Sequence, residues 1–150
     1  MPFAANSRKP PEPVVFFLDR TLGKNVFADA LRKANLDVRI HDDHFSAGEK
    51  DEAWLRDVGQ RRWVVVTNDK KIRYRHNELA ALLRNAVRAF VFTSGNLTGE
   101  EMADVFLKAL PKISRLLEKH PEAFVATISR AAEVRIVSIG LAPGRRRRFR

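Results

Sequence analysis

The sequence predicts an α/β fold of three layers, in which helices cover both faces of a central, mostly parallel sheet. Short β-branched and aromatic runs alternate with longer segments whose apolar residues recur at helical spacing. The links between these segments are short, which favours parallel strands joined by helical crossovers. The chain has 150 residues, of which 45% are hydrophobic, so it can form one domain with a core of its own.

The first half of the chain contains three predicted strands and two predicted helices. Residues 1–13 carry four prolines and little apolar sequence, so we expect an irregular lead-in before the domain, which spans 14–140. The strands are predicted at 14–18, 37–41 and 63–67. One helix should follow Gly23, and another should run through 51–57 and end at Gly59.

The second half continues the alternation and then changes character. A helix is predicted at 78–87 and a strand at 89–93. Thr98 and Glu101 have capping-box spacing and should open a long helix. Pro111 should break or kink that helix, or start a new one. Two short strands, a hairpin or an edge, are predicted at 124–129 and 134–139, before a basic, flexible tail at 141–150.

Composition narrows the classes of function. The chain has no cysteine, so disulfides and thiolate metal sites are excluded, which fits a reducing cytoplasm. No apolar stretch approaches the ~20 residues that a membrane span requires, and the N-terminus lacks the apolar middle of a signal peptide. The formal net charge of +10 indicates an anionic partner, either nucleic acid or an acidic protein.

Two of the predicted strands are followed by a carboxylate. Asp19 comes directly after the first apolar run, and Asp69 follows the third strand after a single asparagine. Because ligands of open parallel sheets bind beyond the carboxyl ends of the strands, we expect the two acids to share one edge. The helix that starts near Asp51 follows the second strand and should begin at that edge.

Carboxylates gathered at one edge repel one another, and burying them unpaired is costly. A hard divalent cation relieves that cost, because Mg²⁺ and Mn²⁺ bind carboxylates together with water and phosphate oxygens. Such a site supports hydrolysis at phosphorus. The catalytic and metal-binding candidates are therefore Asp19, Asp51 and Asp69. The candidates for holding the phosphate backbone are the nearby cations Arg20, Lys70, Lys71, Arg73 and Arg75.

Each candidate also has a purely structural explanation. Asp19 and Asp69 could cap turns, and Asp51 in the first turn of a helix is stabilised by the helix dipole. Glu49 has the spacing of a capping-box partner of Ser46. The cations that follow Asp69 are of a kind common on solvated faces. The functional prediction therefore depends on the three aspartates occurring together.

A family resemblance rests on three segments of the chain, which are Phe16–Arg20, Gly48–Leu55 and Val65–Lys70. With these segments the sequence resembles the PIN-like nuclease superfamily, in particular the VapC-type toxin ribonucleases. The resemblance covers about residues 14–95. It implies a compact α/β/α PIN-like fold whose acidic cluster binds Mg²⁺ or Mn²⁺ and cleaves RNA.

The resemblance assigns a place to each aspartate. By position, Asp19 matches the first-strand acid of the family, Asp51 the helix-borne acid and Asp69 the third-strand acid. Many relatives carry another acid two residues beyond the third-strand aspartate, where this chain has Lys71. The identity of a fourth ligand therefore stays open, with Glu49 and Glu78 as the candidates.

These observations lead us to expect a metal-dependent ribonuclease that is the toxin component of a toxin–antitoxin system. By resemblance, its partners would be RNA, a cognate antitoxin protein and a second copy in a homodimer. The alternative is a catalytically silent PIN-like module that binds RNA or a protein. An aspartyl phosphotransferase or a receiver domain fits less well, because both have an acid pair near the first strand, where Asp19 is followed by Arg20 and Thr21.

Overall fold

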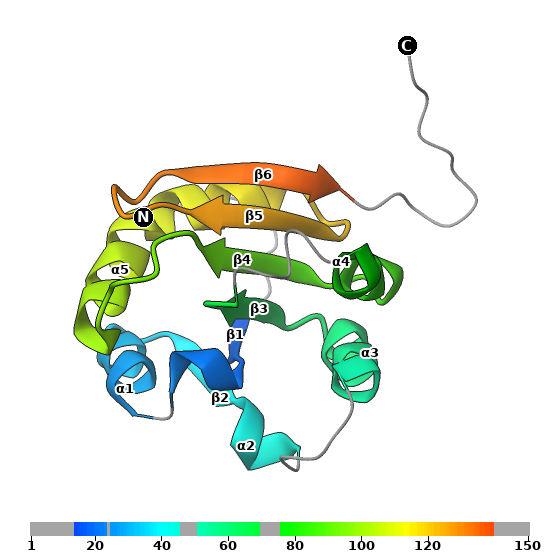
Figure 1. Cartoon of the computed structure of the whole chain (residues 1–150), viewed down its shortest axis with the longest axis horizontal. Coiled ribbons are helices and arrows are strands. Elements are labelled where there is room, and N and C mark those ends of the chain that lie inside the picture. The colour runs from blue at the N-terminus through cyan, green and yellow to red at the C-terminus, as the bar shows by residue number, and fades with distance from the viewer. Residues whose placement is uncertain (1–13, 24, 46–50, 70–75, 140–150) are drawn as a thin grey trace, which may run out of the picture.

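The computed structural model describes residues 14–23, 25–45, 51–69 and 76–139, without the side chains of 51, 52 and 76–78. A six-stranded sheet lies at the centre of the molecule, with helices packed on both of its faces (Figure 1). The α/β fold of three layers that the sequence predicts is thereby confirmed.

The strand order of the sheet is β2-β1-β3-β4-β5-β6. The first five strands in the chain run parallel to one another, and β6 pairs antiparallel with β5 at one edge. The predicted terminal hairpin is therefore confirmed. The strands are β1 (Val15–Leu18), β2 (Asp37–Ile40), β3 (Val64–Thr67), β4 (Arg88–Phe92), β5 (Phe124–Ile128) and β6 (Val134–Ile139).

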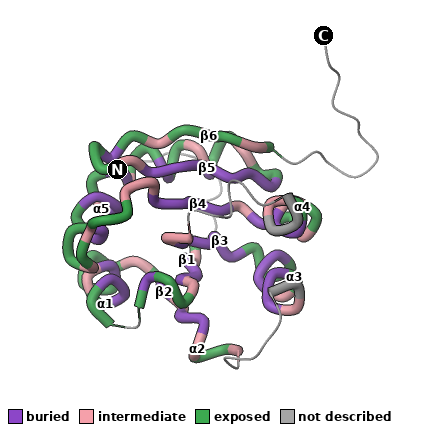
Figure 2. The backbone as a smooth tube through the Cα atoms, viewed as in Figure 1, coloured by how far each residue is buried: buried purple, intermediate pink, exposed green. Residues whose placement is uncertain are grey.

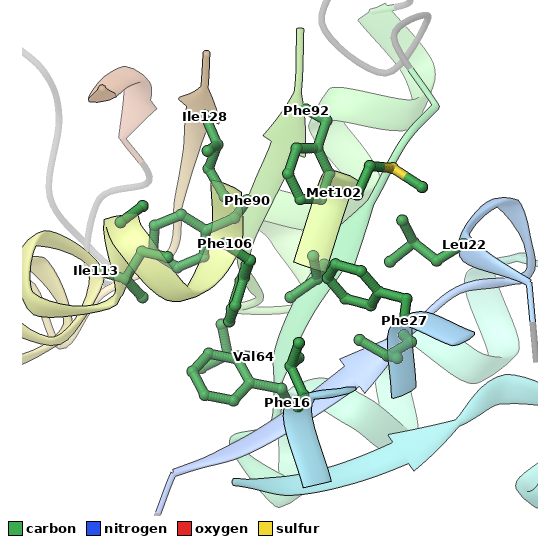
Figure 3. Close-up of a cluster of buried hydrophobic side chains, with 14 of the residues drawn as sticks. Phe16, Leu22, Phe27, Val64, Phe90, Phe92, Met102, Phe106, Ile113 and Ile128 are labelled. Carbon is green, nitrogen blue, oxygen red and sulfur yellow. The ribbon is translucent and has the colours of Figure 1, made fainter. Parts of the chain in front are cut away.

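The larger part of the core lies between the sheet and two helices, α1 (Val26–Lys33) and α5 (Gly99–Lys119). Aromatic rings at this interface pack edge to face, with the Phe106 ring centroid 5.3 Å from that of Phe16 and 5.7 Å from that of Phe27 (Figure 3). All three side chains are buried. Burial of rings this large is a main source of stability for the domain.

The opposite face of the sheet is covered by α3 (Asp51–Arg61) and α4 (His76–Arg84). Side chains alternate along each strand, so Phe17 points to this face while its neighbours in β1 point to the other. The Phe17 ring stacks on Trp63 at 5.8 Å and lies 5.4 Å from Trp54 of α3. Figure 2 shows that the central strands are buried between the two helical layers.

Gly59 does not end the second predicted helix, because α3 continues through it to Arg61. The sequence-based prediction was wrong for a packing reason. A Cβ added to Gly59 would lie 1.9 Å from the backbone oxygen of Asn85, which follows α4. The glycine therefore permits close approach of two segments rather than terminating a helix. The helix predicted at 78–87 also ends early, because α4 ends at Arg84, before Ala86 adopts a φ of 62°.

The long helix α5 begins as predicted and then differs from the prediction. Thr98 and Glu101 form the expected capping box, with Glu101 N donating to Thr98 Oγ1 at 3.1 Å. Pro111 does not divide the helix, which runs from Gly99 to Lys119 as one element. Pro111 lies on the exposed side, so the apolar stripe that faces the core continues past it.

Two short elements connect the sheet to its helices at the edge where β1 and β2 end. A 3₁₀ turn, η1 (Arg20–Leu22), follows β1, and a short helix that was not predicted, α2 (His41–His44), follows β2. The predicted lead-in, the capping box of Ser46 and Glu49, and the basic tail lie outside the described residues. Among the helices that are described, none is long and apolar enough to span a membrane.

Candidate functional site

Asp19 and Asp69 lie at the same edge of the sheet, as predicted. Asp19 directly follows β1, and Asp69 lies two residues beyond β3, the parallel neighbour of β1. The backbone N–H of Asp19 donates to the carbonyl of Val66 at 3.2 Å, so the ladder between the strands extends to the acid itself. The first crossover leads from β1 outward to β2, and the next strand returns to the other side of β1. The acids therefore lie at the switch point where parallel sheets bind ligands.

The Asp19 carboxylate is held by two threonines. Its Oδ1 accepts a hydrogen bond from the Thr21 N–H at 2.9 Å and another from the Thr21 hydroxyl. Its Oδ2 accepts from the Thr67 hydroxyl at 2.5 Å. Because Asp19 is also the N-cap residue of η1, its rotamer is fixed both by local backbone and by a neighbouring strand.

The same hydroxyls connect the two strand ends. The Asn68 N–H donates to Thr21 Oγ1 at 2.8 Å, and the Asp69 N–H donates to Thr67 Oγ1 at 3.0 Å. The two hydroxyls are 3.3 Å apart, and the Thr67 residue is completely buried. The group Asp19, Thr21, Thr67 and Asp69, hereafter the acid end, is thus one network that fixes the carboxylate of Asp19 relative to the backbone of Asp69.

Burial raises the pKa of Asp19 above its ordinary value, because desolvation disfavours the charged carboxylate. The hydrogen bonds from Thr21 and Thr67 act in the opposite direction, since they stabilise the charged form. The negative charge of Asp69 adds to the increase in the Asp19 pKa. The structure therefore places two acids close enough to repel and partly removes one of them from water.

This environment suits a divalent cation. A carboxylate offers about four acceptor sites, and the described residues fill two on Oδ1 of Asp19 and one on Oδ2. A site on Oδ2 therefore remains for a cation, which would also offset the repulsion from Asp69. Mg²⁺ commonly binds through only one or two carboxylates plus water. Within the described ranges no three acidic or histidine side chains form a metal-binding group, so the described part of this site has two carboxylates.

The other predicted ligands are placed only in part. Asp51 is the first residue of α3, and that helix follows β2 and leads back to β3. Its backbone therefore starts near the predicted edge, while its side chain is not described. The side chain of Glu78 in α4 is likewise not described. The remaining predicted site residues lie outside the described ranges, and they are Glu49, Lys70, Lys71, Arg73 and Arg75.

Arg20 is the one predicted phosphate-binding residue that the structure describes. Its guanidinium pairs with Asp42 at 3.2 Å, and more than half of its side chain is exposed. Asp42 also lies 3.3 Å from Nδ1 of the buried His41, which packs against Phe17. Arg20, Thr21, Gly23, Ile40 and Asp42 line a hollow of about 400 Å³. The residue that follows Asp19 is therefore a cation, and it lines a hollow together with Thr21 of the acid end.

The sequence prediction did not include Thr21 and Thr67 in the site. Thr21 stands two residues after Asp19, and Thr67 stands two residues before Asp69. A threonine two residues from an aspartate can form a hydrogen bond with the carboxylate or with the backbone N–H of that aspartate. The spacing therefore indicates the contact of Thr21 with Asp19 and that of Thr67 with Asp69. The bond from Thr67 to Asp19 depends instead on the pairing of β1 with β3.

Comparison with known proteins identifies the family. The family model of the PIN like domain matches residues 14–94, which contain β1 to β4 and both acids of the acid end. The chain belongs to the PIN-like domain family. No curated protein and no solved structure gave a significant match. The match supports a nuclease-type fold in general.

Proposed function

We propose that this PIN-like protein is a metal-dependent ribonuclease that hydrolyses RNA phosphodiester bonds. One observation carries the proposal: two carboxylates meet at the switch point of a PIN-like sheet, and one of them has its pKa raised by burial. A buried acid next to another acid is unfavourable for stability, and such arrangements are concentrated at functional sites. The net charge of +10 is consistent with a polyanionic substrate.

Asp19 and Asp69 would hold Mg²⁺ or Mn²⁺, with Asp51 as the third ligand predicted from the sequence. The ion, when bound, would activate a water molecule for attack at phosphorus and offset the charge that develops there. Glu49 and Glu78 stay candidates for a fourth ligand.

The protein itself supplies orientation. Thr21 and Thr67 hold the carboxylate of Asp19 in one rotamer, and Thr67 also fixes the backbone of Asp69. A preorganised ligand set loses little entropy when the ion and the substrate bind. Arg20 would contact a backbone phosphate beside the acids, since its side chain is exposed and lines the hollow next to Thr21. Lys70, Lys71, Arg73 and Arg75 are proposed to contribute further phosphate contacts.

The cellular role that we propose is the toxin component of a toxin–antitoxin system acting in the cytoplasm. This part of the proposal is supported by the resemblance of three segments to VapC-type toxins. The proposed partner is an inhibitory antitoxin protein, and a homodimer is the proposed assembly. Induced expression should arrest growth, and the Asp19→Asn protein should not. Growth that continues with the active nuclease would contradict the toxin role and leave the proposed chemistry standing.

The chemistry is tested with the purified full chain and a labelled single-stranded RNA, in the presence of Mn²⁺ or of a chelator. We expect cleavage only with the metal. Asp19→Asn and Asp69→Asn should each lower the rate by about 10²–10³, the scale typical for loss of one charge-stabilising group at a reacting centre. Asp104→Asn is the matched control, because Asp104 is an exposed acid of α5.

Two outcomes would contradict the proposed function. Cleavage that survives both substitutions at the acid end would show that the site lies elsewhere. Binding of RNA without cleavage under any divalent metal would favour a catalytically silent PIN-like module. The position of Lys71 in place of a family acid makes that second outcome the one to examine first.

A further inference from the structure

A second hollow, of about 550 Å³, lies along the β5–β6 hairpin and includes residues at its turn. Cationic and hydroxyl side chains contribute to its lining, including Lys112 of α5, Ser129 after β5 and Arg135 of β6. We call this site the basic hollow. One acid, Glu133, also lines it. The basic hollow is built from residues after 94, beyond the segment that matches the PIN like domain.

The basic hollow lies at the same edge of the sheet as the acid end. Strands β3, β4 and β5 are parallel, so the hairpin after β5 emerges where Asp69 follows β3. In Figure 1 the arrowheads of β4 and β5 point the same way, toward the turn that leads into β6. The Lys112 ammonium donates to the Ala132 carbonyl at 3.4 Å, which holds its charge at this turn.

Arg130 occupies the space between the two sites along this edge. It follows β5, and its guanidinium donates to Ser94 Oγ at 3.2 Å, beyond the end of β4. Arg130 and Arg135 are exposed, and no ion pair involves them or Lys112 among the residues that the structure describes. Their charges are therefore available to an anion from outside.

The distances fit one nucleic-acid strand. Neighbouring strands of a sheet are about 4.8 Å apart, so β5 lies roughly 10 Å from β3 and roughly 14 Å from β1. A stacked polynucleotide advances about 3.4 Å per nucleotide. About three to four nucleotides would therefore connect a phosphate at the acid end with a phosphate at the basic hollow.

We infer that Arg130 and the basic hollow bind backbone phosphates of the same RNA strand that is cut at the acid end. The strand would run along the carboxyl edge of the sheet from β1 and β3, past the Arg130–Ser94 contact, to Lys112 and Arg135. The Ser129 hydroxyl accepts from the Glu133 N–H at 3.1 Å and keeps its own proton to donate to a phosphate oxygen. This inference rests on the proposed function, because it assigns the path of that substrate.

The test compares two double variants in an Asp19→Asn background, which keeps the RNA intact. Arg130→Gln with Arg135→Gln removes two charges from the inferred path. Lys33→Gln with Lys119→Gln removes two charges from exposed positions in α1 and α5 and serves as the control. Binding of a single-stranded decamer is measured as a function of salt concentration.

We expect the path variant to bind about tenfold or more weakly, as loss of charge-assisted hydrogen bonds implies. The slope of log affinity against log salt should decrease by about 1.4, because each lost contact with a single strand removes about 0.7. The control should change the affinity and the slope less than the path variant does. Glu133→Gln should act in the opposite direction and strengthen binding, since it removes the acid that lines the hollow.

The possible outcomes distinguish failure of the inferred RNA path from failure of the proposed nuclease function. The path would be overturned if the path variant binds RNA unchanged and the same two arginine substitutions, made with Asp19 intact, leave metal-dependent cleavage unchanged. The proposed nuclease would then still stand. Equal losses for the path variant and the control would also overturn it, because the effect would then be one of net charge. A protein with Asp19 intact that neither binds nor cleaves RNA would overturn both proposals.

Discussion

The acid end and the basic hollow occupy the same edge of one sheet and differ in how their charges are held. At the acid end, Asp19 is partly buried, its carboxylate is bound by two hydroxyls, and its pKa is raised by desolvation. Arg135 of the basic hollow and Arg130 beside it are exposed, and no acid in the described ranges pairs with them.

This difference separates two tasks. Carboxylates that bind a metal must be held in a fixed geometry. Holding them in this way buries part of their charge, which lowers the stability of the fold. Contacts to a phosphate backbone need only charge within reach, which exposed side chains provide at little cost to stability. The acid end also lies within the residues that match the PIN like domain, whereas the basic hollow lies after them. Substitutions at the two regions should therefore have different consequences for stability.

The largest change in stability is expected from Thr67→Val. Valine has nearly the same shape as threonine but lacks the hydroxyl that donates to Asp19 and accepts from the Asp69 N–H. Because Thr67 is fully buried, the loss should cost about 2–4 kcal/mol in the free energy of unfolding. Urea denaturation measures this loss. Thr67→Ser keeps the hydroxyl and is the control, and an equally large loss in that variant would contradict the role of the network.

Metal binding should stabilise the fold in a way that depends on pH. At a concentration of 100 times the dissociation constant, Mn²⁺ should add about 2.7 kcal/mol to the free energy of unfolding. Protons compete with the metal for Asp19, and its pKa is raised. The gain should therefore be largest above that raised pKa and decrease as the pH falls through it. Thermal unfolding with Mn²⁺ and with chelator measures it, and a gain that persists in Asp19→Asn would place the metal elsewhere.

Asp19→Asn should make the protein without metal more stable at neutral pH while it abolishes cleavage. The folded protein retains the Asp19 proton to a higher pH than the unfolded chain, so ionisation reduces stability as the pH rises through the raised pKa. The variant lacks that titration, and its advantage should disappear at a pH below the unfolded value of about 3.9. Each 1 kcal/mol gained would raise the Tm by about 2–4 °C. A variant that is less stable at neutral pH would contradict the cost assigned to the buried acid.

Much of this comparison could be predicted from the sequence. The runs before Asp19 and Asp69 identify buried parallel strands, and parallel strands necessarily bring their carboxyl ends to one edge. The position of both acids followed from that rule. The sequence did not reveal the bond from Thr67 to Asp19, because residues 48 positions apart meet only through strand pairing.

The wrong predictions have the same origin. Gly59 has the local character of a helix terminus, but the residue that explains it is Asn85, in a segment that packs against α3. Pro111 disfavours a helix locally, but the apolar stripe of α5 packs on the sheet along the whole element. The basic hollow and the neighbouring Arg130 were also missed, because Lys112, Arg130 and Arg135 come from separate elements and form no motif in the sequence.

The smallest change in stability is expected for substitutions at Arg130 and at Arg135 of the basic hollow. Arg130→Gln with Arg135→Gln should alter the free energy of unfolding by no more than about 0.5 kcal/mol for each substitution. Both side chains are exposed, and the bond from Arg130 to Ser94 competes with water. Urea denaturation of this double variant beside Thr67→Val measures the contrast directly. A loss as large as that of Thr67→Val would mean that the arginines hold the hairpin in place, and any weaker RNA binding would then follow from a changed fold rather than from lost phosphate contacts.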